Sequence, residues 1–193
     1  MKICVYGASS NSIDKKYIEA GERLGSLMAE RGHALVFGGG ANGLMGAVAR
    51  GEAKKGGEII GVAPSFFNVD GILYEDCTQF FYTETMRERK QKMEELSDAF
   101  IMTPGGIGTF EEFFEILTLR QLARHNKPIA VLNTNGYYNA LCELIDTAIA
   151  GGFMTEQNRE LFFVSESEQE LLSYFENYKP SEGGIEKYKD IKN

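Results

Sequence analysis

Cysteine and histidine are scarce in this chain of 193 residues, which has three cysteines and two histidines. Cys4, Cys77 and Cys142 are widely spaced and have no close cysteine or histidine companion, which argues against a disulfide framework and a zinc site. His33 and His125 have no partner at a metal-ligand spacing, and they do not suffice to assemble a Ser-His-Asp triad. We therefore expect reduced thiols, structural histidines and no metal site.

Long apolar runs and an excess of positive charge are also absent from the sequence. No run approaches the roughly 20 apolar residues of a membrane-spanning helix, and no basic segment with a long apolar stretch precedes the first strand-like run. The chain has 20 basic and 28 acidic residues and a formal net charge of −8, which disfavours a nonspecific grip on DNA or RNA. We expect a cytoplasmic protein that binds a small molecule, with neither a membrane nor a nucleic acid as its partner.

Two common nucleotide-binding motifs are missing as well. The first strand-like run ends in YGASSNS, residues 6–12, without the G-x-G-x-x-G that holds a dinucleotide. No glycine-rich turn is followed by the Gly-Lys-Ser or Gly-Lys-Thr of a P-loop. NAD is therefore not expected, and we predict an activity that uses no cofactor.

Apolar strand-like runs alternate with helical patterns along most of the chain. This alternation indicates βαβ units and a mostly parallel sheet with helices on both faces. We predict one Rossmann-like, doubly wound α/β domain over residues 1–178 and a flexible polar tail over residues 179–193. The longest irregular segment, residues 64–78, is a candidate functional loop. The predicted strands are residues 3–6, 35–37, 59–63, 80–82, 99–102, 129–132 and 162–164, and the predicted helices are residues 14–31, 44–55, 84–96, 109–123, 137–149 and 168–178.

A glycine-rich turn, PGGIGTFEE at residues 104–112, lies between a predicted strand and a predicted helix. Its glycines let the backbone approach a ligand closely, and the first amides of a helix are unpaired donors at the positive end of the helix dipole. Glu112 adds a carboxylate beside these amides. The segment indicates an anion cradle with a reactive acid next to it.

The same residues fit a structural alternative, because Thr109 and Glu112 have the spacing of a capping box. Ser167 and Glu170 have this spacing too, without a preceding glycine turn, and there capping is a sufficient explanation. Three glycines in four positions carry an entropic cost in folding that a cap does not require. We therefore favour a functional role for the turn and keep capping as the alternative.

Two basic residues lie on the apolar face of the helix predicted over residues 84–96. Helical spacing places Arg89 and Lys90 on the side that also carries its methionines and a leucine. A buried cation needs a counter-charge, which Glu112 or a bound phosphate could supply. Alternatively, both side chains extend along an apolar stem to water.

A second glycine-rich turn, GGGANGLMG at residues 38–46, follows the second predicted strand. Both turns could face the crevice at the carboxyl ends of the strands, where open α/β sheets bind ligands. Gly39, Gly40 and Gly43 could then lie against the sugar of a ligand whose phosphate occupies the first turn. Close packing of strand against helix explains these glycines equally well.

Taken in order, these motifs resemble the LOG family of cytokinin riboside 5'-monophosphate phosphoribohydrolases over residues 3–178. The most specific marks are PGGxGTxxE at residues 104–112 and the upstream helix motif that ends in Arg89-Lys90. The resemblance implies hydrolysis of the N-glycosidic bond of an adenosine 5'-monophosphate, N6-modified or plain, to the free base and ribose 5-phosphate. It also implies a homodimer with the site near the subunit interface.

The resemblance further implies that Arg89 and Glu112 are catalytic. A carboxylate near the sugar suits this chemistry, because positive charge builds on the ribose as the base departs. Arg89 could bind the phosphate, hold Glu112 ionised or assist the departing base, and the sequence does not decide among these roles. The positions that match substrate-binding residues of the family are Lys90, Gly105, Gly106, Ile107, Gly108, Thr109 and Thr118.

Other functions stay open at this point. The chain could bind or carry a nucleotide without catalysis, or it could hydrolyse plain AMP in purine salvage. Arg87 and Ile107 depart from residues common in the family, which leaves the base specificity open. Some relatives carry a lysine decarboxylase label, but this sequence has no motif that would support pyridoxal phosphate chemistry.

Overall fold

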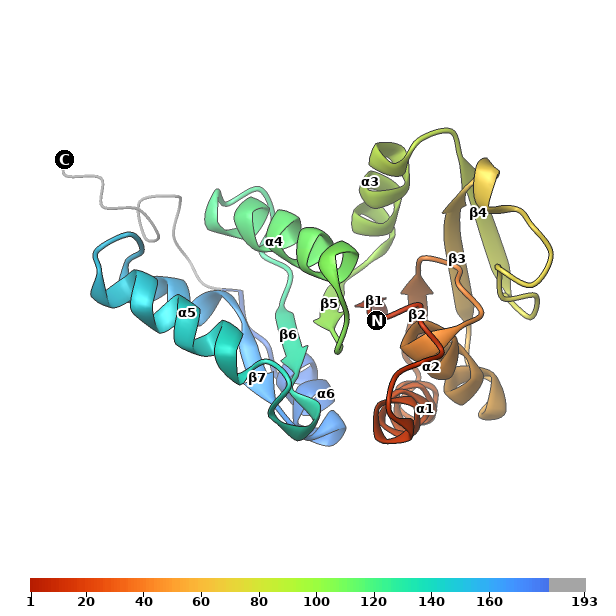
Figure 1. Ribbon diagram of the computed structural model, residues 1–193, viewed down its shortest axis with the longest axis horizontal. Coiled ribbons are helices and arrows are strands. Elements are labelled where there is room, and N and C mark those ends of the chain that lie inside the picture. The colour runs from red at the N-terminus through yellow and green to blue at the C-terminus, as the bar shows by residue number, and fades with distance from the viewer. Residues whose placement is uncertain (181–193) are drawn as a thin grey trace.

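A seven-stranded sheet with the order β4-β3-β2-β1-β5-β6-β7 runs through the computed structural model, which describes residues 1–180 (Figure 1). Every pair of neighbouring strands is parallel. The strands are β1 (Lys2–Tyr6), β2 (Ala34–Phe37), β3 (Ile59–Pro64), β4 (Gln79–Thr83), β5 (Ala99–Met102), β6 (Ile129–Leu132) and β7 (Phe163–Ser165). The helices are α1 (Lys15–Glu30), α2 (Gly43–Lys54), α3 (Met86–Leu96), α4 (Ile107–Gln121), α5 (Asn139–Ala150) and α6 (Glu168–Glu176).

Each face of the sheet has its own hydrophobic core. Successive side chains of a strand point to opposite faces, so Cys4 and Tyr6 of β1 join one core while Ile3 and Val5 join the other. Helices α3, α4 and α5 contribute buried residues to the first core, and α1, α2 and α6 to the second. Burial on both faces explains the continuous apolar runs of the central strands.

The strand order reverses direction beside β1, as in doubly wound folds. From β1 the chain builds outward through β2 to β4 on one side and through β5 to β7 on the other. Ligands bind at such a switch point, outside the carboxyl ends of the strands. The loops after β1 and β5 meet there, where the Ala8 amide donates to the Pro104 carbonyl at 3.1 Å.

The predicted fold class and the order of all seven strands and six long helices are confirmed. Three short 3₁₀ segments were not predicted: Ser65–Phe67, Thr134–Gly136 and Glu156–Leu161. The predicted tail lies outside the described residues from residue 181 onward. Within residues 1–180, every helix is too short or too polar to cross a lipid bilayer.

Candidate active site

A cleft of about 680 Å³ opens at the carboxyl ends of β1, β2 and β5. Its walls come from the loop after β1, both glycine-rich turns, α3 and the segment between β3 and β4. Two other hollows within residues 1–180 have similar volumes, about 630 Å³ between α1 and α2 and about 700 Å³ at the amino ends of the strands. Of the three, the cleft at the carboxyl ends is lined by Glu112 and by helix-start amides, so we take it as the candidate site.

The glycine-rich turn after β5 offers a row of unpaired amides to the cleft. Gly106 is the N-cap of α4, and the amides of Gly106, Ile107, Gly108 and Thr109 have no hydrogen-bond acceptor among the described residues. All four residues line the cleft. Gly105 does not; its amide faces the hydroxyl of Tyr138 instead. Unpaired amides at a helix N-terminus, backed by the helix dipole, make a site for an anion.

The capping-box alternative for this turn is wrong. Helix α4 begins at Ile107, two residues before the predicted start, so Thr109 and Glu112 both lie inside the helix. The cap residue is Gly106, which makes no side-chain cap. At α6, by contrast, the Ser167 side chain accepts from the Glu170 amide as that spacing predicts.

Arg89 and Glu112 meet at the floor of the cleft, from α3 and α4 respectively. Arg89 Nη1 donates to Glu112 Oε1 at 2.7 Å, and Arg89 Nε donates to the Val62 carbonyl of β3 at 3.2 Å. Both side chains are buried. Glu112 Oε2 has no hydrogen-bond donor among the described residues. The inward-facing arginine therefore has the counter-charge that its sequence position required.

Burial and ion pairing act in opposite directions on Glu112. Burial raises the pKa of its carboxyl above the usual range, and the Arg89 guanidinium lowers it without cancelling the effect of burial. A carboxylate with a raised pKa is a better proton acceptor than a solvated one. The arrangement thus holds a basic carboxylate next to the anion cradle.

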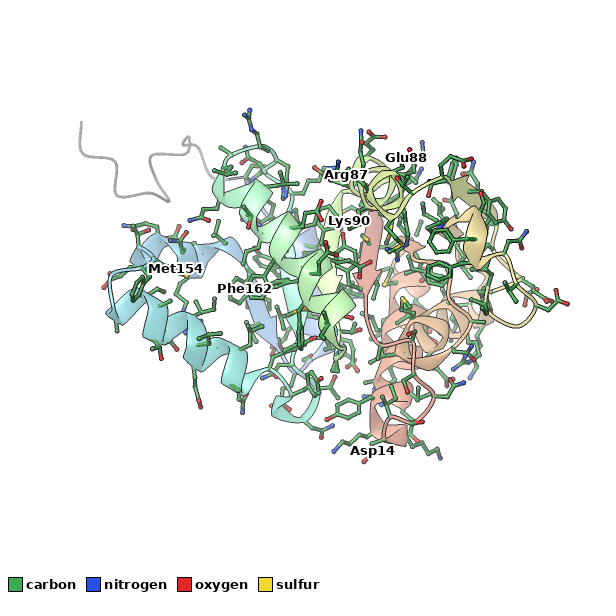
Figure 2. All side chains as sticks on the ribbon, turned by 45° about the horizontal axis from the view of Figure 1, so that its top comes forward. Asp14, Arg87, Glu88, Lys90, Met154 and Phe162 are labelled. Carbon is green, nitrogen blue, oxygen red and sulfur yellow. The ribbon has the colours of Figure 1, made fainter. Side chains whose placement is uncertain are left out.

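Lys90 and Thr118 do not line the cleft. Lys90, labelled in Figure 2, is half-buried and pairs across from α3 with Glu111 and Glu115 of α4. Its ammonium does not line the cleft. Thr118 is exposed further along α4. Within one chain, the structure therefore brings Arg89, Glu112 and the glycine turn together in the cleft. Lys90 shares a separate small cavity of about 10 Å³ with Glu112, and Thr118 lines neither space.

The sequence allows two roles for the glycines of the second turn, contact with a ligand and close packing of strand against helix, and the structure shows both. Gly40 lines the cleft. Gly39 and Gly43 have positive φ angles of 75° and 59°, and a Cβ at either position would clash, with the Phe80 ring or with the Ala8 carbonyl. The amide of Gly43 is already bound to Asn11 Oδ1 at 2.8 Å. Close packing is a sufficient explanation for Gly39 and Gly43.

One wall of the cleft is apolar, and the sequence did not predict the residues that form it. It comes mainly from the irregular segment after β3, for which the sequence predicts a functional loop but not which side chains face the ligand. The Tyr74 amide donates to the Gly39 carbonyl and the Ala41 amide to the Ile72 carbonyl, which fasten this segment to the second glycine turn. Apart from Ala8 and Ile107, the apolar lining residues are Met45, Phe67, Ile72, Leu73 and Met86.

The cysteines and histidines lie outside the cleft, as expected. All three cysteines are free, and burial raises the pKa of the Cys4 thiol to about 12. His33 contacts Glu176 of α6, and His125 contacts the Ile116 carbonyl. Burial lowers the pKa of His125 to about 4. Within residues 1–180, the acidic residues, cysteines and histidines form no cluster that could hold a metal ion.

Comparison with known proteins identifies the family. The family model described as "Possible lysine decarboxylase" matches residues 45–175. A rice (Oryza sativa subsp. japonica) protein named probable cytokinin riboside 5'-monophosphate phosphoribohydrolase LOGL5 is 38% identical over 179 residues, 93% of this chain and 73% of the relative. This chain belongs to the LOG family. An Arabidopsis thaliana member, named cytokinin riboside 5'-monophosphate phosphoribohydrolase LOG5, is 36% identical over 184 residues, 95% of this chain and 81% of its own length.

Solved structures support the fold. A molybdenum cofactor binding protein from Rippkaea orientalis matches with a TM-score of 0.70 and 20% identity, over 91% of this chain and 94% of that one. The molybdenum cofactor carrier protein of Chlamydomonas reinhardtii matches with a TM-score of 0.68 and 19% identity, over 91% and 95%. At this identity the likeness extends to the fold alone.

The cleft does not suit pyridoxal phosphate, the cofactor that a lysine decarboxylase would be expected to use. Such enzymes hold the cofactor through a lysine, and none of the described residues that line the cleft is a lysine. Lys90, the nearest candidate by sequence, is occupied by Glu111 and Glu115 outside it. The family model's description therefore gives no mechanism for this LOG protein.

Proposed function

We propose that this LOG protein hydrolyses the N-glycosidic bond of adenosine 5'-monophosphates, N6-modified or plain. The products are the free base and ribose 5-phosphate. The observation that carries the proposal is the position of the buried Arg89–Glu112 pair beside four unpaired amides in one cleft. An anion site alone has no use for a carboxylate, whereas cleavage at a sugar does.

In the proposed reaction a water molecule attacks C1′ of the ribose as the bond to the base breaks. Positive charge develops on the ring, and the Glu112 carboxylate stabilises it and takes a proton from the water. The hydroxyl of the water goes to C1′, and the proton becomes available to the departing base. Arg89 keeps Glu112 ionised in its buried position, a role favoured by the 2.7 Å contact between them.

The substrate phosphate would lie on the amides of residues 106–109. Binding energy from this non-reacting group holds the sugar at the distance that attack requires. Nucleosides without the phosphate should therefore be poor substrates. The base would lie against the apolar wall formed by Phe67, Ile72 and their neighbours, which suits either adenine or an N6-modified adenine.

The test is chromatographic detection of free base after incubation with isopentenyladenosine monophosphate, AMP and the two corresponding nucleosides. Release from the monophosphates alone supports the proposal, and the ratio of the two rates gives the base preference. Tight calorimetric binding of these monophosphates with no product over hours would replace the enzyme with a nucleotide carrier.

We also propose that the protein is a homodimer that buries the outer stripe of α4. Helical spacing places Ile107, Phe114 and Thr118 on one exposed line, and Ile107 and Phe114 are 86% and 39% exposed, so a partner could bury both apolar side chains at once. A partner covering this stripe would also place Thr118 at an interface, which fits the substrate-binding role that the family resemblance gives it.

The proposed location is the cytoplasm. Free thiols at all three cysteines fit a reducing compartment. The formal net charge of −8 supports a small-molecule substrate over a nucleic acid partner.

A further inference from the structure

Three successive carbonyls, that of Thr103 and those of the first two residues of the glycine-rich turn, each accept a hydrogen bond from a segment distant in sequence. The Tyr138 hydroxyl donates to the Thr103 carbonyl at 2.8 Å. The Ala8 amide donates to the Pro104 carbonyl at 3.1 Å. The Tyr137 hydroxyl donates to the Gly105 carbonyl at 2.9 Å. The two adjacent tyrosines belong to the connection between β6 and α5, far from the turn in sequence.

These bonds differ in what they do for the cleft. In a planar trans peptide, the carbonyl of one residue and the amide of the next point in opposite directions, and the described residues contain no cis peptide. The bond to the Gly105 carbonyl therefore turns the Gly106 amide toward the cleft. The peptide after Thr103 leads into Pro104, which has no N–H. The Gly105 amide faces the Tyr138 hydroxyl and does not line the cleft, so the Tyr138 hydroxyl aims no donor at the cleft.

The Gly106 carbonyl accepts from the Phe110 amide at 3.0 Å and Gly105 packs against Thr109, but among the described residues no other hydrogen bond holds the peptide between Gly105 and Gly106. A Cβ added to Gly106 would meet nothing within 4 Å, so packing does not hold that residue. Glycine also has more backbone freedom than any other residue. The Tyr137 side chain is itself held by edge-to-face contacts, with ring centroids 5.8 Å from Tyr17 and 4.9 Å from Tyr138.

We propose that Tyr137 is a positioning residue for phosphate recognition. It acts through the Gly105 carbonyl and keeps the Gly106 amide aimed at the bound phosphate group. The inference rests on the proposed function, because it takes the phosphate of a nucleoside monophosphate as the ligand of this turn. Tyr137 does not line the cleft, so its effect should belong to binding and not to the chemical step.

The matched pair of variants is Tyr137→Phe and Tyr138→Phe, each of which loses one hydroxyl and keeps its ring. Ribose 5-phosphate binding is measured by calorimetry on the full-length protein. KM and kcat are measured for AMP and for isopentenyladenosine monophosphate. Thermal unfolding of both variants reports the structural effect of each lost hydroxyl.

Tyr137→Phe should weaken ribose 5-phosphate binding and raise KM by about 3-fold to 10-fold, the effect of one hydrogen bond, with kcat changed less than about 2-fold. Tyr138→Phe leaves the buried Thr103 carbonyl and the Gly105 amide without their hydroxyl partner, so it should lower Tm. Neither group lines the cleft as a donor, so the Kd for ribose 5-phosphate should be unchanged. An unchanged Kd in Tyr137→Phe, or equal weakening in both variants, overturns the proposal.

Failure of the proposed function remains separable from failure of this inference. If the wild-type protein releases no base, the hydrolase assignment fails, while ribose 5-phosphate titration of the two variants still tests Tyr137. If the wild-type protein does not bind ribose 5-phosphate, Tyr137 loses its ligand and the inference is overturned.

Discussion

Arg89 Nη1 lies 2.7 Å from Glu112 Oε1 in a pair whose members are 6% and 9% exposed. The two residues come from different helices, α3 and α4, and meet at the end of the sheet where the strand order reverses. Two charges buried together stabilise each other, but either one alone is strongly destabilising. A change in the charge of either residue should therefore alter the stability of the protein as well as the candidate active site.

Removing only the arginine should be worse for stability than removing both charges. Arg89→Met leaves Glu112 buried without a counter-charge, and we expect a loss of about 3 to 5 kcal/mol in the free energy of unfolding at pH 7. The double variant Arg89→Met/Glu112→Leu should recover much of that loss. Urea denaturation measures both values, and a double variant as unstable as the single one would contradict this account of the pair.

The pH dependence of the reaction should report Glu112. Its carboxylate must be ionised to accept a proton, and its pKa is raised by burial, so kcat/KM should fall as the pH decreases through a value above the usual range of a glutamate. Arg89→Lys, which keeps the charge but loses the guanidinium fork, should move this limb further upward. An acid limb at the ordinary glutamate pKa would argue against Glu112 as the proton acceptor.

The fold could be predicted from the sequence because the spacing of apolar residues shows which side chains are buried. Continuous apolar runs predicted the central strands, and the inward position of Arg89 predicted a buried counter-charge such as Glu112. The partners of Lys90 were not predictable in the same way. Lys90 is flexible and lies at the edge of the apolar face, so it could pair with Glu112, bind a phosphate or extend to water. In the structure it pairs with the carboxylates of Glu111 and Glu115.

The apolar wall and the start of α4 were harder for a different reason. Phe67 and Ile72 lie in an irregular segment, where no period tells which side chains face inward. Helix α4 starts at Ile107 because Gly106 can act as a cap without a side-chain bond, whereas the sequence offered Thr109 as the more common type of cap. Tertiary contacts decide which side chains form the wall, and these contacts leave no local signal in the sequence.

Glu52 should make the protein less stable as the pH rises. It is fully buried in α2, neither carboxylate oxygen has a hydrogen-bond partner among the described residues, and burial raises its pKa to about 8. The unfolded chain loses this proton near the ordinary glutamate pKa of about 4.3, so the free energy of unfolding falls between that pH and about 8, by several kcal/mol at most.

The neutral variant Glu52→Gln removes this dependence. It should be more stable than the wild-type protein at pH 8 and differ little from it at pH 5, as measured by urea denaturation at both values. The neighbouring surface variant Glu58→Gln serves as a control for general charge effects, because Glu58 is exposed. Equal stability of Glu52→Gln and the wild-type protein at pH 8 would show that Glu52 is not buried as a neutral acid.

If the proposed dimer forms, a charged substitution should disrupt it only on the outer stripe of α4. Phe114→Glu places a charge on that stripe and should convert the dimer to a monomer, because an unpaired charge at a buried interface is expensive. Phe66→Glu changes an equally large exposed side chain after β3 and should leave the assembly unchanged. Light scattering of the purified proteins distinguishes the two, and a wild-type monomer would refute the dimer outright.

The most direct test of the central claim is base release from AMP and isopentenyladenosine monophosphate by the wild-type protein, Glu112→Gln and the surface control Glu95→Gln. Glu112→Gln keeps the shape of the side chain and an oxygen that can accept from Arg89 but removes the charge, so thermal unfolding of the variant accompanies the rate measurement. At a temperature where it is folded, it should lose about 10²-fold to 10⁴-fold in rate. Glu95→Gln, on the exposed side of α3, should match the wild-type protein. Full turnover by Glu112→Gln would contradict the assignment of Glu112 as the carboxylate that acts on the ribose.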